Sequence, residues 1–307
     1  MFELTIQSAS KKYLESRNSL LQDALRDHSF DFNIDSEYPL TLSPSSLKHS
    51  YIGLHEGKVI THGNLFPRVL LSAGQEIGNI ALIGNIATNE SYRGRGLMRS
   101  TLEFLENQAE SNGIKALILW SDLNSFYEKL GFKKIGSENR FFIDREKVKN
   151  SNTQTSLDIY VENPKNIDQN LTSELLNIRE EVGTTVQRSP FEFAELLKIP
   201  NTYLIAASSS IGIEGYAIIG KGADFGGVIH EWGFKNFKTC LGIINKIFDL
   251  TDFAELIMIT PKDSRLDQQL KEISNSCESH SMGLCKVLDK SITEYCENLF
   301  IWGLDSI

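Results

Sequence analysis

The sequence has 307 residues, of which 41% are hydrophobic and 23% charged, and this length and composition predict a globular protein with two domains. No apolar run approaches the ~20 residues that cross a bilayer, and the N-terminus lacks the residue order of a secretory signal. We therefore expect a cytoplasmic protein with no membrane as a partner, and the formal net charge of −9 argues against nucleic acid as a partner.

The charge is distributed unevenly along the chain. Residues 1–150 carry 18 basic and 18 acidic side chains, so the whole net charge lies in residues 151–307. Apolar periodicity disappears over residues 147–156, where short polar side chains accumulate. We predict a domain boundary near Asn150, with domains over 1–150 and 151–307. The four cysteines all lie in the second domain at spacings that no structural zinc site uses, so we expect no metal and no disulfide framework.

In the first half, hydrophobic patterns alternate between strand and helix periods. The first predicted elements are a helix from Leu14 to Leu25, two extended runs between Tyr51 and Leu71 that turn at 55–58, and a strand from Ile77 to Thr88. They are followed by a helix from Met98 to Ala109 that Gly113 stops, a strand from Ile114 to Trp120, a short helix from Asn124 to Leu130, and an extended segment from Phe132 to Ile143.

The second half repeats this order more faintly. It predicts a hairpin of 203–207 and 215–220, a strand over 227–234, a helix over 241–248, a strand over 256–259, a helix over 266–276, and strands near 284–287 and 299–302. The likeness between the halves lies in element order and not in residue identity, so it suggests a duplication.

The strongest local pattern lies in residues 86–98, where a strand passes through a turn rich in arginine and glycine into a helix. Gly94 and Gly96 have no Cβ atom, so the backbone N–H groups of the turn are open to an anion. The helix directs the positive end of its dipole to the same place. The pattern predicts a phosphate-binding turn to which Arg93 and Arg95 add charge; the alternative is an ordinary turn with solvated arginines.

A second pattern, Tyr-x-x-x-Gly-Phe, follows the next expected strand. With the first pattern it resembles the GNAT superfamily of N-acetyltransferases, whose signatures are Arg/Gln-x-x-Gly-x-Gly/Ala and Tyr-x-x-x-Gly-Phe. The residues at these positions are Arg93, Gly96 and Met98 for the first signature, and Tyr127, Gly131 and Phe132 for the second. The resemblance covers roughly residues 50–143 and extends to the order of the elements.

The resemblance implies an α/β (α+β) fold with two tandem acetyltransferase-like domains, each a mixed, mostly antiparallel sheet flanked by helices. It implies that acetyl-CoA is the cofactor and that a small-molecule or peptide amine is the partner substrate. The acetyl group then moves to a primary amine by direct attack on the thioester. The residues that it assigns to the cofactor are Ile86, Ala87, Thr88, Arg93, Gly94, Arg95, Gly96, Leu97, Met98, Asn124 and Tyr127. The alternative for Asn124 is to cap its helix.

The reaction needs a proton donor and a base. By resemblance, Tyr127 is the general acid for the departing thiolate; the alternative is a core tyrosine on a short helix. An amine of pKa about 10.4 is neutral only to roughly one part in a few thousand at pH 7, so a base or a desolvating pocket is required. We identify no base in the first half, since Glu90, His55 and His62 are more typical of surface or packing residues.

Met98 departs from the family pattern, because glycine or alanine usually stands there. Its side chain either crowds the pyrophosphate or turns into the core below the helix. This departure and the missing base motivate a second hypothesis, a non-catalytic coenzyme A-binding regulator or scaffold. Tandem acetyltransferases of the enhanced-intracellular-survival type also tolerate a larger residue there, and their two-domain layout is partly similar to this chain.

The second half lacks the glycine-rich turn at its corresponding junction, residues 233–239, so we expect a degenerate acetyltransferase-like domain without a phosphate site. We read His230, Glu231 and Trp232 as residues of a buried strand. In the tandem acetyltransferases the terminal carboxylate reaches the catalytic cleft, and by that resemblance we predict that the carboxylate of Ile307 acts beside Tyr127. The alternative is that 299–304 forms the last strand and Ile307 merely ends it.

Overall fold

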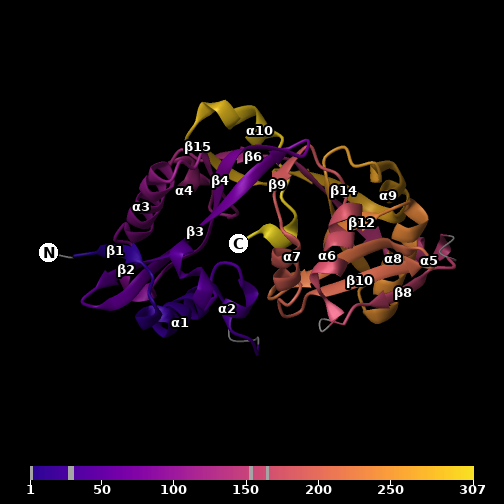
Figure 1. Cartoon of the computed structure of the whole chain (residues 1–307), viewed down its shortest axis with the longest axis horizontal. Helices are drawn as coiled ribbons and strands as arrows, with labels where there is room; N and C mark the ends of the chain where they lie inside the picture. The colour runs from indigo at the N-terminus through magenta and orange to yellow at the C-terminus, as the bar shows by residue number, and fades with distance from the viewer. Residues whose placement is uncertain (1–2, 27–30, 152–154, 164–165) are drawn as a thin grey trace.

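The computed structural model describes residues 3–26, 31–151, 155–163 and 166–307. Two mixed, mostly antiparallel sheets stand side by side with helices packed on them, and the C-terminal segment runs between them (Figure 1). The expected α+β class with two sheets is confirmed. No helix in the described residues is both long enough and apolar enough to cross a membrane.

The first sheet has the order β1-β2-β3-β4-β5-β15-β6, and β9 pairs with β3. Its strands are β1 (Thr5–Ser8), β2 (Ser50–His55), β3 (Lys58–Ser72), β4 (Gln75–Thr88), β5 (Ala116–Leu119), β6 (Lys133–Ile135), β9 (Thr184–Val186) and β15 (Gly283–Val287). Among these described strands, β4 and β5 run parallel and the other pairs are antiparallel.

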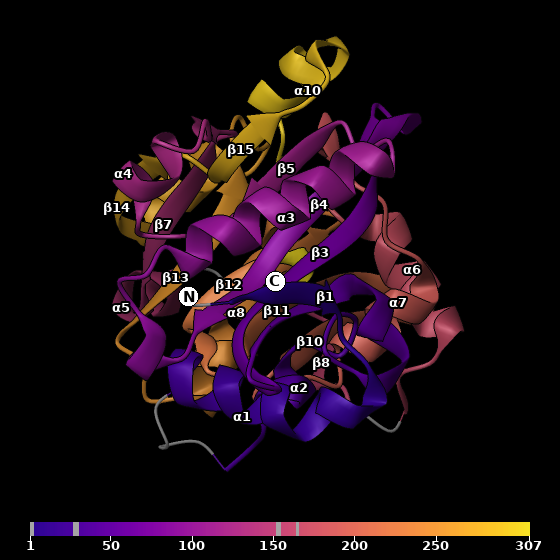
Figure 2. The same ribbon diagram turned by 90° about the vertical axis from the view of Figure 1, so that its left-hand side faces the viewer.

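The first sheet packs against helices whose apolar faces the sequence predicts. The helices of this half are α1 (Leu14–Leu25), α2 (Ile34–Glu37), α3 (Leu97–Ser111) and α4 (Asn124–Glu128). Figure 2 shows α3 lying across β3, β4 and β5. Leu102, Leu105 and Ala109 recur at helical spacing and are buried on the face of α3 that packs against the sheet. The predicted amphipathic pattern therefore positions the helix.

The second sheet has the order β14-β7-β13-β12-β11-β10-β8. Its strands are β7 (Glu138–Asp144), β8 (Asp158–Val161), β10 (Tyr203–Ser209), β11 (Gly212–Lys221), β12 (Asp224–Phe234), β13 (Glu255–Pro261) and β14 (Ser274–His280). The remaining helices are α5 (Arg145–Asn150), α6 (Gln169–Ile178), α7 (Pro190–Leu196), α8 (Phe237–Leu250), α9 (Asp267–Ile273) and α10 (Thr293–Glu297), and of these α10 packs against the first sheet. The predicted hairpin, the strands 227–234 and 256–259 and the helix 241–248 all lie within these elements.

Each sheet contains strands from the other half of the sequence, β9 and β15 in the first sheet and β7 in the second. β15 lies between β5 and β6 in the first sheet, and β7 lies between β13 and β14 in the second. The exchanged strands are apolar where they enter the cores: Phe141 and Ile143 of β7 are fully buried, and Leu284 of β15 is 2% exposed. The two halves are therefore joined by main-chain hydrogen bonds as well as by side-chain packing.

This exchange corrects several sequence predictions. The expected boundary near Asn150 does not coincide with the change of sheet, because β7 already belongs to the second sheet. Residues 147–150, expected to be linker, end α5, whose Val148 is buried in the second core; residues 152–154 lie outside the described part. The strand predicted at 284–287 belongs to the first sheet, and the helix predicted over 266–276 gives way to β14 at Ser274. Periodicity detects a strand but not its partner.

We predict that residues 1–150 alone do not fold cooperatively. Without β15, the facing edges of β5 and β6 lose their hydrogen-bond partner and the core around Ile118 opens. Thermal unfolding of this fragment followed by circular dichroism should show no sigmoidal transition, whereas the full chain should. Co-expression with residues 151–307 is the control that should restore the transition; a fragment that melts cooperatively by itself would contradict the prediction.

Candidate functional site

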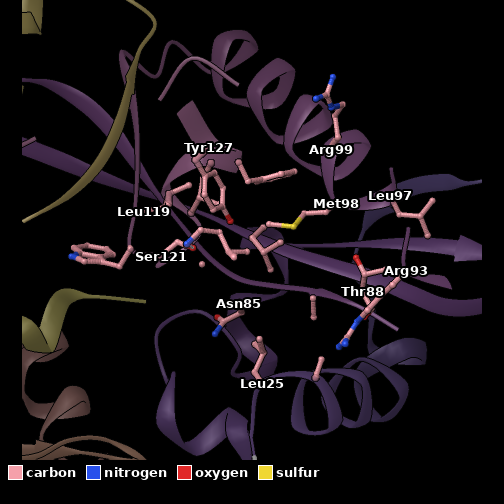
Figure 3. Close-up of a pocket in the computed structure, with 18 of the residues that line it drawn as sticks. Leu25, Asn85, Thr88, Arg93, Leu97, Met98, Arg99, Leu119, Ser121 and Tyr127 are labelled. Carbon is pink, nitrogen blue, oxygen red and sulfur yellow. Dashed lines mark hydrogen bonds between the residues drawn. The ribbon is translucent and has the colours of Figure 1, made fainter. Parts of the chain in front are cut away.

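The site lies where the two parallel strands of the first sheet separate. β4 and β5 pair only at Ala81 with Leu117 and Leu82 with Ile118. Beyond these pairs, β4 continues to Thr88, and a cavity of about 670 Å³ opens between the strands (Figure 3). An edge of β4 that no strand covers leaves main-chain N–H and C=O groups available to a ligand.

A β-bulge in β4 opens this cavity. The β3–β4 register shifts between His62 and Asn64, and Asn85 adopts a left-handed backbone with φ 49°. The bulged carbonyl of Asn85 accepts a hydrogen bond from His62 Nδ1–H at 2.8 Å, and His62 Nε2 accepts one from the Ser50 hydroxyl at 2.6 Å. Arg17 Nη1 donates to the same hydroxyl at 3.3 Å. A chain of buried hydrogen bonds thus holds the bulge from behind.

His62 is a structural residue of the site. Its side chain is fully buried, and burial lowers the pKa of His62 to about 3, with Arg17 acting in the same direction and the Asn85 carbonyl opposing it. Both ring nitrogens are occupied, so the neutral imidazole serves to fix the bulge. This agrees with the packing role predicted from the sequence.

The glycine-rich turn lies at one end of the cavity. Gly94 and Gly96 both have φ 77°, a conformation that favours glycine, and a Cβ atom at either position would meet open space. Gly96 is the N-cap residue of α3, so the unpaired N–H groups of the first turn of α3 are exposed beside Arg93. This geometry fits a bound pyrophosphate.

The predicted cofactor residues do not all line the cavity. Those that do are Ile86, Ala87, Thr88, Arg93, Gly94, Gly96, Leu97, Met98 and Tyr127. The guanidinium of Arg95 instead lies over the ring of Tyr92, 5.6 Å from its centroid, and Arg95 is not among the described residues that line the cavity. Asn124 is absent from this lining too, and it does not cap α4, because Leu123 holds the N-cap position.

Two polar side-chain atoms beside the cavity are buried without a hydrogen-bond partner: Asn85 Oδ1 and Thr88 Oγ1. Buried polar atoms are normally paired. The open edge of β4, these two atoms and the exposed turn before α3 together form a set that a ligand with amide groups and phosphates would satisfy. Figure 3 shows Met98 extending toward the middle of this set, while it also packs against the first core.

Tyr127 is the buried acid candidate. Its side chain is 4% exposed, and its ring packs edge-on against Phe126 and Phe132 at centroid distances of 5.2 and 5.6 Å. Burial raises the pKa of Tyr127 to about 12, against a smaller opposite effect of Ser121. Figure 3 shows its hydroxyl pointing into the cavity, so a protonated donor faces the ligand space at neutral pH.

The last residue of the chain lies in the same cavity. A Cβ atom added to Gly84 would fall 2.6 Å from the carboxyl carbon of Ile307 and 2.7 Å from its oxygen, so the terminus rests directly on β4 next to the bulge. The alternative in which 299–304 forms a final strand is wrong, since Leu299 makes one isolated bridge to Thr184 and residues 303–305 form a 3-10 turn. Tyr127 and Ile307 therefore line the same cavity.

The corresponding opening in the second sheet is filled. β12 and β13 pair in parallel at Val228 with Ile257 and Ile229 with Met258. Past these pairs, Trp232 Nε1 donates to the Ile259 carbonyl at 3.0 Å and its ring contacts Trp302. A side chain therefore bridges the strands where a ligand would enter the first sheet.

The strand residues His230, Glu231 and Trp232 are fully buried, in agreement with their structural interpretation. The sequence pattern did not predict the ionic partners of Glu231. Glu231 pairs with Arg188, which also binds Asp305, and Lys221 binds the C-terminal segment. Within the described residues, no three His, Cys, Asp or Glu side chains are grouped as metal ligands.

Comparison with known proteins agrees with this geometry. Residues 5–135 match the family model described as an acetyltransferase (GNAT) domain. No protein with a curated description matches the sequence.

Several solved structures share the whole fold. A probable N-acyltransferase from Enterococcus faecalis is 16% identical with a TM-score of 0.73, over 94% of this chain and 73% of that one. A GCN5-related N-acetyltransferase from Kribbella flavida is 12% identical with a TM-score of 0.68, over 94% and 72%. Eis1 from Mycobacterium abscessus is 13% identical with a TM-score of 0.59, over 94% and 74%. At these identities the likeness establishes the fold.

We predict that acid destabilises the protein partly through His62. An unfolded histidine titrates near pH 6.5, whereas buried His62 stays neutral down to about pH 3, so the unfolded state binds the extra proton between these values. The free energy of unfolding should then fall by about 2 kcal/mol per such histidine from pH 7.5 to pH 5. His62→Gln should make the pH dependence of urea denaturation shallower. His280→Gln, at a side chain that is 39% exposed, is the control; identical slopes in all three proteins would contradict the prediction.

Proposed function

We propose that this chain is an acetyl-CoA-dependent N-acetyltransferase acting on a primary amine, because residues 5–135 match the acetyltransferase (GNAT) domain model and the chain shares its fold with solved GCN5-related N-acetyltransferases. The observation that carries the proposal is the cavity beside β4, where an exposed helix start, an open strand edge and a buried, protonated tyrosine meet. A cytoplasmic location belongs to the proposal.

The chain offers separate residues for each part of the cofactor. The backbone at Gly94 and Gly96 and the guanidinium of Arg93 would hold the pyrophosphate, since charge-assisted contacts at a helix N-terminus are strong. The main chain of Ile86, Ala87 and Thr88 would pair with amide groups as an added strand does. The bound cofactor supplies an acetyl group activated as a thioester.

The remaining chemistry is proton transfer by two groups of the chain. The carboxylate of Ile307 attracts the cationic amine and takes a proton from its nitrogen, directly or through a water, which leaves the nitrogen lone pair free to attack. As the bond from nitrogen to the acetyl carbon forms and the carbon–sulfur bond breaks, the Tyr127 hydroxyl would donate its proton to the leaving sulfur, and the resulting tyrosinate would take the second proton from the nitrogen. A pKa of about 12 keeps that hydroxyl protonated until it is needed. The terminal carboxylate thus supplies the base that side chains of the first half lack.

A coenzyme A-binding regulator is the second candidate, and the position of Met98 favours it, because its side chain extends into the cavity. Calorimetry with acetyl-CoA and an assay of thiol release over a panel of primary amines separate the two functions. We expect one binding site per chain, since Trp232 closes the second opening, together with turnover on at least one amine. Binding without turnover on any amine supports the regulator.

We predict that Tyr127→Phe lowers kcat on the order of 10²-fold and leaves the acetyl-CoA affinity within a few-fold of wild type, because it removes a proton donor but little volume. Steady-state kinetics and calorimetry measure the two effects. Tyr51→Phe is the matched control, since this tyrosine is 8% exposed in the same core. Near-wild-type turnover of the Tyr127 variant across the pH range would assign the acid to another group.

We predict that deleting Ser306 and Ile307 lowers kcat/KM for the amine on the order of 10²-fold at pH 7. The difference in kcat/KM between the truncated protein and wild type should decrease toward pH 10, because an amine of pKa about 10.4 loses its proton increasingly without a base. Ile307→Ala is the control, because it keeps the terminal carboxylate and removes only the side chain. A truncated protein with the wild-type rate and melting temperature would exclude the carboxylate from the reaction.

A further inference from the structure

We propose that Lys221 of the second half is a positioning residue that holds the chain terminus in the cavity of the first half. This inference rests on the proposed function, in which the terminal carboxylate acts as the base. It assigns the second half a part in the reaction, namely to deliver and orient a group that the first half does not contain.

The C-terminal segment, residues 299–307, is anchored first by its aromatic side chains. Phe300 and Trp302 are buried in the second core, where the Trp302 ring packs edge-on against Trp232 at 5.8 Å. Leu299 and Ile301 alternate with these residues and are buried against the first sheet, so the segment lies between the two sheets. It ends on Gly84 of the first sheet, and Figure 1 shows its overall course.

A buried ionic cluster fixes the middle of the segment. Asp305 accepts from Arg188 Nε at 3.0 Å and from Arg188 Nη2 at 2.6 Å, while the same guanidinium bonds Glu231 at 2.7 and 2.8 Å. Arg68 of β3 lies 3.5 Å from Asp305 and 2.5 Å from Glu192. The pKa of Asp305 is lowered by Arg188 and Arg68 against the opposing effect of burial, so the carboxylate stays ionised. Residues of both halves meet at this one side chain.

Lys221 then holds the residues next to the terminus. Its Nζ donates to the Gly303 carbonyl at 3.0 Å, to the Ser306 hydroxyl at 3.0 Å and to the Ser306 carbonyl. The last contact is the informative one, because the Ser306 carbonyl belongs to the peptide unit that carries Ile307. A rigid peptide plane held by a buried ammonium restricts the direction in which the terminal carboxylate points.

The environment of Lys221 favours this role over a general stabilising one. Lys221 is 4% exposed, and its Nζ lies 6.0 Å from the centroid of the Tyr38 ring. Among the described residues, the oxygens to which it donates all belong to the C-terminal segment. Burying an ammonium is costly unless it is hydrogen-bonded. The C-terminal segment provides the hydrogen-bond acceptors of Lys221, so replacing the lysine removes contacts of that segment before any others.

The test uses Lys221→Met in the full chain, because Arg188 variants would leave two buried carboxylates uncompensated and unfold the protein. Lys147→Met is the matched control, since Lys147 also donates to a main-chain carbonyl, that of Ser274 at 2.7 Å, away from the C-terminal segment. We expect Lys221→Met to lower kcat about tenfold, with an unchanged KM for acetyl-CoA. We expect the control to keep the wild-type kcat.

Two further measurements separate positioning from stability. In the chain that lacks Ser306 and Ile307, Lys221→Met should cause no additional loss of kcat, because a residue that acts only through the terminus has nothing left to position. Carboxypeptidase A should release Ile307, detected by mass spectrometry, at least several-fold faster from Lys221→Met than from wild type or the control.

The outcomes are distinct. Release of Ile307 by carboxypeptidase A at the same rate from wild type, Lys221→Met and Lys147→Met overturns the role of Lys221. An equal loss of kcat on Lys221→Met in chains with and without Ser306 and Ile307 overturns it as well. If wild type turns over no amine, the proposed function fails, and the release of Ile307 alone decides whether Lys221 holds the terminus.

Discussion

One hydrogen bond, from His62 Nδ1 to the bulged carbonyl of Asn85, is the constraint on which the site depends. A bulge places one extra residue in β4 and turns the strand away from its parallel neighbour. Without that turn, β4 and β5 would stay paired and no opening would exist between them. The His62 imidazole is buried and neutral, so it gives the bulge a fixed hydrogen-bond donor on the side away from the cavity. The opposite side of the bulge lines the cavity.

The second half of the chain is joined to this site in two ways. β15 lies between β5 and β6, so the first sheet is completed by residues far away in the sequence. The C-terminal segment ends on Gly84, at the bulge itself. The second half keeps the same strand order but fills its own opening with Trp232. The two sheets therefore differ in use: the first has an open site, and the second contacts the C-terminal segment that enters it.

Local sequence predicted the helices and strands that carry strong periodicity, and the family resemblance predicted nine cofactor residues among the described residues that line the cavity. Leu14 to Leu25 is helical as expected, and the turn before α3 has the glycine conformations that an anion site requires. Residues 147–150, expected to be linker, are helical, while Arg95 and Asn124 are absent from the described lining of the cavity. The position of each of these residues depends on its contacts in the folded chain, and residue spacing in the sequence does not contain that information.

The sequence by itself determined the class of fold, the glycine-rich turn and the tyrosine of the same cavity, because these depend on residues close together in the chain. Tertiary structure alone decided that β7 and β15 exchange sheets, that His62 supports a bulge, and that Arg188 and Lys221 hold the C-terminal segment. These contacts join residues more than 80 positions apart in several cases, such as Lys221 with Gly303. Their partners are selected by burial and charge pairing in the folded chain, which leave no periodic trace in the sequence.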